Sequence, residues 1–311
     1  MRSGTRTRRP RLGRVTKGKK LPRQATLVVN AASRSGDESF AEARDKLTAA
    51  GVELIDAKRC RSARAMTAAV KRAVKQAPMV IVGGGDGSLS EMVDLFLGTD
   101  TVFALLPLGT ANSFARTLGI PLDLDGAVGV IAGGVARQID LASIDGDHFL
   151  NNAALGLAPK VAESVPKGLK RALGRAGYLL WAGWSAASFR AFRLTVDDGQ
   201  REHRMWATEV RIANGRFHGG MELIESADVQ SGEIVIQAVV GRSVVRLGFS
   251  YLASALKLRR RHETVREFHG PRMRIDTRPR MRVSIDGELG PETPFEACAV
   301  PEAITVAAPR G

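Results

Sequence analysis

The chain has 311 residues, of which 44% are hydrophobic and 25% charged, a composition that excludes a disordered, collagen-like or disulfide-scaffold protein. At about 150 residues per domain this length suggests two domains. The formal net charge of +14 predicts an anionic partner, although charge alone does not separate a phospholipid surface from nucleic acid.

Much of the positive charge lies at the N-terminus, where residues 1–23 contain ten lysines or arginines and no acidic residue. This segment has no apolar face to bury, so we expect a disordered basic tail. No secretory signal core and no uncharged apolar stretch of about 20 residues is visible. With only two cysteines and no CxxC pair, the sequence favours a cytoplasmic protein.

Short apolar runs alternate with helical periodicity between residues 24 and 143. This alternation predicts an α/β domain whose mostly parallel sheet is covered on both faces. The expected strands lie at 26–30, 52–55, 79–82 and 101–107. The expected helices lie at 39–50, around 66–74, and at 89–97 and 112–118.

The pattern changes beyond about residue 137 to alternating, β-rich runs separated by turn residues. This texture predicts a second domain of antiparallel strands. We expect strands near 192–196, 205–213, 232–240, 273–275, 281–285 and 304–307. Two helical stretches, at 167–189 and 244–260, interrupt them.

A glycine-rich turn over residues 83–87 directly follows one strand and directly precedes a helix. Without Cβ atoms, such a turn lets backbone N–H groups approach phosphate oxygens, and the helix start adds donors and partial positive charge. Asp86 within it is a candidate for holding Mg²⁺ or orienting a transferred phosphate. The pattern is neither a dinucleotide fingerprint nor a Walker A loop. A plain tight turn is the structural alternative.

Ser88 and Glu91 have two interpretations that the sequence leaves open. Ser-x-x-Glu before an apolar run is typical of a capping box at a helix N-terminus. The same two residues also continue the phosphate-binding turn and can contact a nucleotide.

Two further loops, at 30–36 and 106–116, stand at the ends of expected strands and contain small polar residues and glycine. Loops after parallel strands gather at one edge of the sheet, where ligands bind. Asn112 or Ser113 is equally suited to cap the following helix. The candidate ligand contacts in the two loops are Asn30, Ser33, Gly109, Thr110 and Asn112.

Together the three loops resemble those of the diacylglycerol kinase-like lipid kinases, which include bacterial lipid kinases and sphingosine and ceramide kinases. Residues 84–88 (Gly-Gly-Asp-Gly-Ser) are similar to the family's nucleotide loop, with Glu91 at its usual acidic position. Residues 107–121 are similar to a second family signature. Shorter markers of the junction and second domain lie at 139–141, 149–152 and 214–220.

The resemblance implies a lipid kinase that uses ATP and Mg²⁺. It implies a doubly wound α/β nucleotide-binding domain at 24–143 and a β-rich, β-sandwich-like domain at 144–303 that receives the lipid substrate. The final strand, near 304–307, is implied to return to the first domain. The implied nucleotide-binding residues are Asn30, Ser33, Gly84, Gly85, Asp86, Gly87, Ser88, Glu91, Gly109, Thr110 and Asn112.

Residues 284–288 (Ser-Ile-Asp-Gly-Glu) resemble the family element whose aspartate accepts or orients the proton of the lipid hydroxyl. The resemblance makes Asp286 the main catalytic residue, with Glu288 as its neighbour and Asp86 across the site. Taken without the resemblance, Asp286-Gly287 predicts an ordinary hairpin turn, because Asp-Gly favours positive φ between two strands.

The chain departs from the family pattern between residues 225 and 235, where three expected carboxylates are missing. Asp228 is the remaining candidate ligand for a structural metal, and Asp86 is the candidate for contact with ATP-bound Mg²⁺. His218, beside two glycines, either lines the substrate cleft or is a solvated loop residue.

The stretch 167–189 mixes basic residues with Tyr178, Trp181 and Trp184, which suits either a bilayer headgroup region or a core helix. We expect peripheral attachment to an anionic membrane and no nucleic-acid partner. The oligomeric state stays open, a homodimer being one option.

Two other functions are compatible with parts of the pattern. NAD kinases share the Gly-Gly-Asp-Gly loop but carry a downstream Asn-Glu pair, which this chain lacks. A catalytically idle membrane- or nucleic-acid-binding protein is the other, and the presence of Asp86, Asp286 and Glu288 opposes it.

Overall fold

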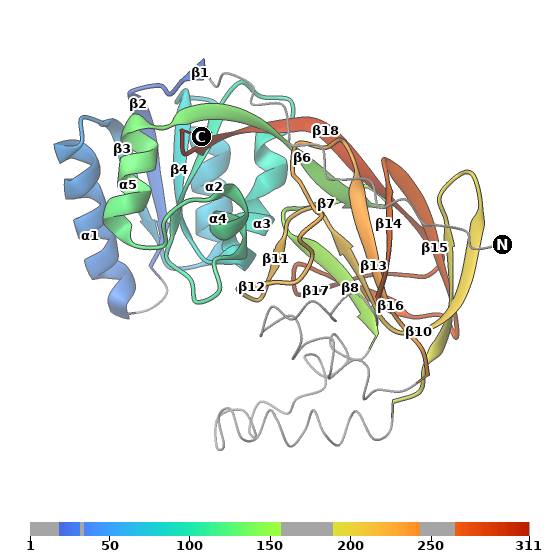
Figure 1. Ribbon diagram of the computed structural model, residues 1–311. Helices are drawn as coiled ribbons and strands as arrows, with labels where there is room; N and C mark the ends of the chain where they lie inside the picture. Colours follow the sequence, from blue (N-terminus) through green and yellow to red (C-terminus); the bar gives the residue numbers. More distant parts are fainter. Residues whose placement is uncertain (1–18, 32–33, 157–188, 243–264, 311) are drawn as a thin grey trace.

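The computed structural model describes residues 19–31, 34–156, 189–242 and 265–310 (Figure 1). Ser33 and nearly all of the two helical stretches expected at 167–189 and 244–260 lie outside these ranges.

The first domain is built on four parallel strands, as the alternating sequence pattern predicts. Two of them, β4 (Met79–Gly84) and β5 (Val102–Pro107), are apolar runs buried along their whole length, which is typical of parallel strands covered on both faces. In sheet order the strands are β3 (Glu53–Cys60), β2 (Gln24–Asn30), β4 (Met79–Gly84) and β5 (Val102–Pro107).

Helices cover both faces of this sheet, which makes the domain doubly wound (Figure 1). One face carries α1 (Arg34–Ala49) and α5 (Leu124–Gly133), which contact each other. The other carries α2 (Ala63–Ala73), α3 (Asp86–Val93) and the short η1 (Asp94–Phe96). A further short helix, α4 (Ser113–Leu118), follows β5.

The second domain consists of antiparallel strands, which confirms the expected β-rich texture. In sheet order the main strands are β17 (Glu288–Glu292), β16 (Arg282–Ile285), β8 (Asn152–Gly156), β10 (Glu202–Ala213), β9 (Phe192–Asp197) and β15 (Arg272–Arg278). Branching from β10 are β13 (Ile234–Val240) and then β14 (Val265–Gly270). Short strands are β7 (Asp147–Phe149), β11 (Phe217–His218) and β12 (Met221–Glu222).

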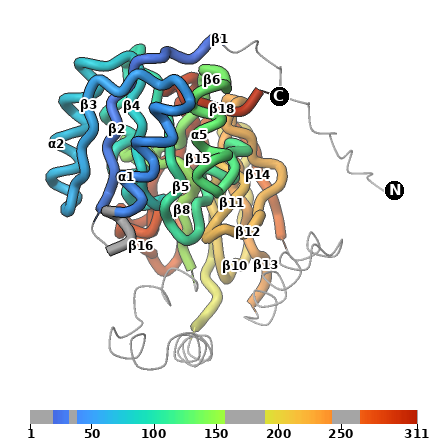
Figure 2. Tube along the Cα trace, turned by 90° about the vertical axis from the view of Figure 1, so that its left-hand side faces the viewer, coloured from blue at the N-terminus to red at the C-terminus, as the bar shows by residue number. Residues whose placement is uncertain are grey.

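Two long strands, β6 (Val135–Ile144) and β18 (Phe295–Ala308), run through both domains as an antiparallel pair. Figure 2 shows them together above α5. Near its end β18 also pairs in parallel with β5, through Val306 and Phe103. The first hydrophobic core includes Leu141 and the second includes Ala142, so the two cores meet along β6.

The tail assigned to residues 1–23 extends too far into the fold. Lys19–Lys20 form strand β1, which pairs with Val135 and Ala136 of β6, and Leu21 is 6% exposed. Burial of one leucine and the strand pairing fix residues 19–23 to the first domain. No helix within the described ranges combines the length and apolarity needed to cross a membrane.

Candidate active site

Helix α3 begins inside the glycine-rich turn, earlier than the sequence pattern suggests. Gly85 is its N-cap residue and makes no side-chain cap, so Ser88 lies within the first turn. The Ser88 hydroxyl accepts a hydrogen bond of 3.0 Å from the Asn30 amide instead. The capping-box interpretation of Ser88 and Glu91 is therefore wrong. The first N–H groups of the helix have no intrahelical partner and form a potential anion site.

The glycines of the two loops differ in whether the fold has room for a side chain at their positions. A Cβ on Gly109 would lie 2.5 Å from the Cα of Gly85, and one on Gly84 would lie 2.9 Å from the Cβ of Ser88. The second loop thus packs its backbone directly on the first. A Cβ on Gly87 would meet nothing within 4 Å. Gly87 is therefore the glycine of this turn whose small size the fold itself does not require.

Asp86 joins the two loops through its carboxylate. Its oxygens accept hydrogen bonds from the backbone N–H groups of Ser113, at 2.9 Å, and Phe114, at 3.0 Å. A carboxylate at these positions satisfies unpaired donors of α4 and complements the helix dipole. Asp86 therefore caps a neighbouring helix, a role that the sequence left open for Asn112 or Ser113.

Asn112 shapes its own loop and is 5% exposed. It adopts φ 47°, which asparagine tolerates better than most residues. Its amide accepts from the Gly109 N–H at 2.9 Å and donates to the carbonyls of Gly109 and Pro107. The neighbouring Thr110 is exposed and open to a ligand.

Asp286 occupies the predicted hairpin turn between β16 and β17. Both Asp286 and Gly287 have positive φ, at 45° and 98°, as a two-residue type I′ turn requires. The Asp286 carboxylate accepts a hydrogen bond of 2.6 Å from the Ser90 hydroxyl on α3. It also accepts from the backbone N–H groups of Leu150, at 3.0 Å, and Asn152, at 3.1 Å.

These surroundings act on the Asp286 carboxyl in opposite directions. Burial raises its pKa above the ordinary value, while the hydrogen bonds from Ser90 and the backbone of residues 150–152 lower it. The net direction is upward. A carboxylate with a raised pKa accepts a proton more readily near neutral pH than an ordinary aspartate does.

A cavity of about 220 Å³ brings parts of both domains together. Gly87 from the glycine-rich turn and Asp286 from the hairpin turn both line it. His148 pairs with Asp94 at 3.0 Å in its wall. Among the described residues that line it, none is lysine or arginine. The acidic lining residues are Glu91, Asp94, Asp147, Asp286 and Glu288.

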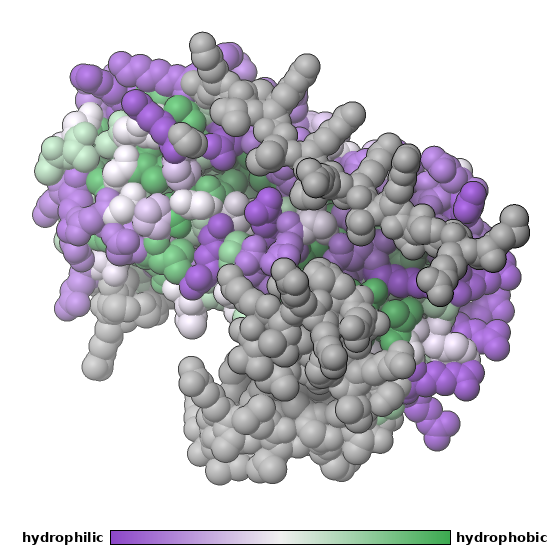
Figure 3. Space-filling model, viewed as in Figure 1, coloured by the Kyte–Doolittle hydropathy of each residue, from purple (hydrophilic) through white to green (hydrophobic). Residues whose placement is uncertain are grey.

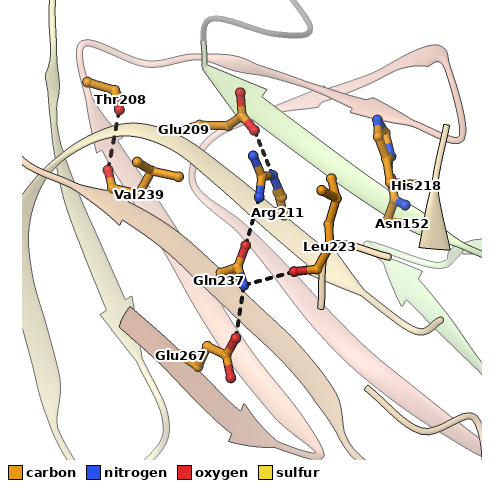
Figure 4. A network of polar contacts seen from close by, with 9 residues as sticks. All are labelled: Asn152, Thr208, Glu209, Arg211, His218, Leu223, Gln237, Val239 and Glu267. Carbon is orange, nitrogen blue, oxygen red and sulfur yellow. Dashed lines mark hydrogen bonds and ion pairs between the residues drawn. The ribbon is translucent and has the colours of Figure 1, made fainter. Parts of the chain in front are cut away.

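A second link connects Asn152, beside the Asp286 turn, to the loop at 106–116. The Asn152 amide donates to the Phe217 carbonyl and accepts from His218, whose ring lies beside it in Figure 4. The next residues of that hairpin continue the link, because the Gly220 N–H donates to the Ser113 hydroxyl at 3.1 Å. His218 is exposed and is not among the residues that line the cavity, so its place in a substrate cleft stays a prediction.

Ser90, Leu150 and Asn152 were not among the expected site residues. Leu150 and Asn152 lie in the segment 149–152, which resembles a family marker, but the resemblance indicated no function for either residue. Ser90 had no signal of its own, because its contact with Asp286 joins residues 196 positions apart.

Asp228 lies in a turn that hydrogen bonds hold closed. The Asp228 carboxylate accepts a hydrogen bond from the Gln230 N–H. The carboxylate of Asp140, which is buried, accepts hydrogen bonds from the Gly232 N–H at 2.6 Å and from the Glu302 N–H at 2.9 Å. In the described ranges, no group of three or more acidic, histidine or cysteine side chains could hold a metal ion. A metal role for Asp228 stays a prediction.

Comparison with known proteins matches both halves of the chain to family models. Residues 24–144 match the diacylglycerol kinase catalytic domain. Residues 152–308 match the model described as the YegS C-terminal NAD kinase beta sandwich-like domain.

Similar sequences and structures agree with these matches. A probable lipid kinase YegS-like protein of Pseudomonas aeruginosa is 32% identical over 75% of this chain and 77% of its own length. A protein of the same description from Chromohalobacter salexigens is 29% identical over 75% and 76%. The structure of a putative diacylglycerol kinase from Bacillus anthracis superposes with a TM-score of 0.78 at 23% identity, covering 94% of this chain and 97% of that one.

Proposed function

Because the chain belongs to the diacylglycerol kinase-like lipid kinases, we propose that it transfers the γ-phosphoryl group of ATP to the hydroxyl group of a lipid. Membership in the family makes the protein a phosphotransferase of the lipid kinase class. The nucleotide, the metal ion and the lipid acceptor are parts of the proposal.

The observation that carries the proposal is the cavity shared by Gly87 and Asp286. It places the unpaired N–H groups at the start of α3 beside a carboxylate suited to accept a proton. In phosphoryl transfer, positioning and charge stabilisation supply most of the catalysis.

Asp286 has the role of orienting the lipid hydroxyl and accepting its proton. As the lipid oxygen bonds to the γ-phosphorus, the bond from that phosphorus to the bridging oxygen breaks and ADP leaves. Ser90 and the N–H groups of Leu150 and Asn152 hold the carboxylate in place during this step. Glu288, at the far side of the turn, is exposed and lines the same cavity.

The nucleotide would bind where α3 begins, with Gly87 leaving room for a phosphate and Thr110 reaching it from the second loop. Asp86 and Asn112 support this site by fixing the two loops, since their side chains bond within and between them. Gly84, Gly85, Ser88 and Asn30 build the floor of the first loop in the same way.

The donor set of the cavity suits Mg²⁺. Mg²⁺ commonly takes one or two carboxylates and completes its shell with phosphates and water. Five carboxylates line this cavity, and phosphates cannot approach them closely without a cation between. Glu91 and Asp94, on the α3 side, are the residues that would hold the ion, which supplies neutralisation of the transferring phosphate.

An acceptor panel tests the proposal. Purified protein is incubated with γ-labelled ATP and Mg²⁺ plus diacylglycerol, a sphingoid base, NAD or no acceptor, and label in the lipid and soluble fractions is counted. We expect label only in the lipid fraction and only in the presence of Mg²⁺. Transfer to NAD alone would identify an NAD kinase. No transfer in any arm, with ATP bound normally, would reject kinase activity.

A further inference from the structure

Two arginines lie over one tryptophan of the second domain, and a third arginine stands opposite one of them. Arg193 stands opposite Trp206 across the β9–β10 pair, with its guanidinium carbon 5.4 Å from the ring centroid. Arg242, just beyond β13, stacks over the same ring at 4.1 Å. Arg278 stands opposite Arg193 across the β9–β15 pair. We call these four residues the arginine–tryptophan patch.

The patch faces away from the core of the second domain. Arg193 is exposed, whereas its neighbours Phe192 and Leu194 are buried, so the strand alternates between inner and outer face. Arg242 and Arg278 are exposed as well. Figure 3 shows mostly hydrophilic residues along the right-hand edge of the molecule, where Figure 1 draws β15.

The three arginines make no hydrogen bond or ion pair with a carboxylate in the described part of the chain. Elsewhere on these strands arginines do have such partners, as Arg272 does with Glu296. Like charges directly opposite each other on neighbouring strands destabilise a sheet. The pair Arg193 and Arg278 therefore favours a bound anion, which would remove their mutual repulsion.

The chemistry of the patch suits phosphate esters at a bilayer surface. A guanidinium group binds phosphate through two parallel hydrogen bonds, and tryptophan prefers the boundary between apolar chains and water. Arg242 covers the Trp206 ring, which leaves little ring face for stacking a nucleic-acid base. Phospholipid headgroups therefore fit the patch better than single-stranded nucleic acid.

The position of the patch separates it from the catalytic cavity. Trp206 precedes Ala213 by seven residues on β10, and Ala213 pairs with Asn152 beside Asp286. At the rise of a strand this is about 20 Å. In sequence, the aromatic and basic stretch 167–189 ends shortly before Arg193, and the basic run 257–282 includes Arg278.

We propose that the arginine–tryptophan patch docks the second domain on anionic phospholipid headgroups. This inference rests on the proposed function, because a lipid kinase must meet its acceptor at a bilayer. The inference adds a surface, distant from the cavity, that would hold the enzyme at the bilayer.

Vesicle cosedimentation of the full-length protein tests the proposal without using catalysis. The patch variant combines Arg193→Ala, Arg242→Ala and Arg278→Ala. The control variant removes the same charge from helix α2 by exposed-site changes Arg64→Ala, Lys71→Ala and Arg72→Ala. Vesicles contain phosphatidylcholine alone or with phosphatidylglycerol, at low and high salt, and melting temperatures verify folding.

We expect the patch variant to bind anionic vesicles at least about fivefold more weakly than wild type at low salt, and the control variant to stay within about twofold. The difference should shrink at high salt because charges at the surface are screened. Equal losses in both variants would show binding by net charge alone, and no loss in the patch variant would also overturn the proposal.

Two further arms separate this inference from others. If the patch variant loses affinity for single-stranded RNA but not for vesicles, the surface binds nucleic acid and the proposal is wrong. Turnover of a soluble short-chain lipid should be the same in all three proteins. If wild type shows no turnover, the proposed function fails, while the vesicle result still decides the role of the patch.

Discussion

The hydroxyl of Ser90 lies 2.6 Å from Oδ2 of Asp286, and this contact joins helix α3 of the first domain to the hairpin turn of the second. Asp86 is the first residue of α3, and Ser90 lies one helical turn further along the same helix. The helix whose first turn can bind a phosphate therefore also holds the carboxylate that can accept the proton.

Replacing Ser90 with alanine should change the pH dependence of turnover. The hydroxyl lowers the pKa of Asp286 against the effect of burial, so its loss raises that pKa further. A base must be deprotonated, and the acidic limb of kcat/KM should therefore move to higher pH. Initial rates between pH 5 and 9 measure the shift.

Ser90→Thr is the matched control, because threonine keeps the hydroxyl. Its acidic limb should coincide with that of wild type. If Ser90→Ala lowers the rate equally at every pH, the contact only supports the fold and does not act on the base.

Asp286→Asn should reduce turnover by about 10²-fold or more while leaving ATP affinity within about twofold. Asparagine has the same size and tolerates the positive φ of this turn, so the hairpin should persist. The anionic proton acceptor is lost, and because the amide nitrogen cannot accept, the N–H of Leu150 or of Asn152 also loses its partner. Steady-state kinetics and calorimetric titration with ATP separate the two quantities, and near-normal turnover would remove Asp286 from the mechanism.

Two alanine substitutions separate loop packing from ligand approach. Gly109→Ala places a Cβ 2.5 Å from the Gly85 backbone and should destabilise the protein by about 1 to 3 kcal/mol. Gly87→Ala meets no atom of the fold, so its melting temperature should stay near that of wild type while its affinity for ATP falls. Normal ATP affinity in Gly87→Ala would place the phosphate site elsewhere.

Local signals in the sequence were sufficient for much of the architecture. The apolar runs of β4 and β5 predict buried parallel strands, and the Asp286-Gly287 turn follows from the φ preferences of those two residues. The glycine-rich turn between β4 and α3 also follows from the sequence, whereas its role in binding phosphate stays a prediction.

Contacts between distant segments were not predictable in the same way. The capping of α4 by Asp86 and the clamp between Asn152 and His218 join residues that no local pattern connects. The capping box at Ser88 failed because the glycines let the helix begin at Asp86, two residues before the serine that was expected to cap it. The hydrogen-bond partners of these side chains thus depend on contacts between distant segments, which local sequence patterns do not contain.

Glu267 should make the second domain sensitive to acid. Burial acts to raise its pKa, but the His269 ring, 3.8 Å away, and hydrogen bonds from Gln237 and Ser226 bring it down to about 2, from 4.5. The two hydrogen bonds of 2.9 Å, from Gln237 and Ser226, hold its carboxylate in place, and Figure 4 shows the first of them. A depressed pKa stabilises the fold above about pH 4.5, and this contribution disappears as the pH falls toward 2.

Glu267→Gln should therefore destabilise the protein by about 1 to 3 kcal/mol at pH 7 and by much less at pH 3. Urea unfolding at pH 7, 5 and 3 measures the difference. Glu53→Gln, at an exposed site on β3, is the control and should leave stability unchanged at each pH. A pH-independent loss in Glu267→Gln would show that shape rather than charge matters at this site.

Deleting residues 2–18 should weaken binding to anionic vesicles without affecting catalysis. This segment contains seven of the ten cations near the N-terminus. Each lysine or arginine near an anionic bilayer contributes at most about 1 kcal/mol, an effect that salt screens. The deletion ends before β1 and Leu21, because these residues pair with β6 and are part of the first domain.

Cosedimentation at two salt concentrations measures the effect, and we expect at least about tenfold weaker binding at low salt with little difference at high salt. Turnover of a soluble short-chain lipid should stay near wild type, because the loops that line the site begin only at Asn30. A full-length variant with glutamine at the seven cationic positions separates charge from length and should behave like the deletion. If both variants bind anionic vesicles as wild type does, the tail has no part in membrane attachment, and the charge of the folded domains accounts for it alone.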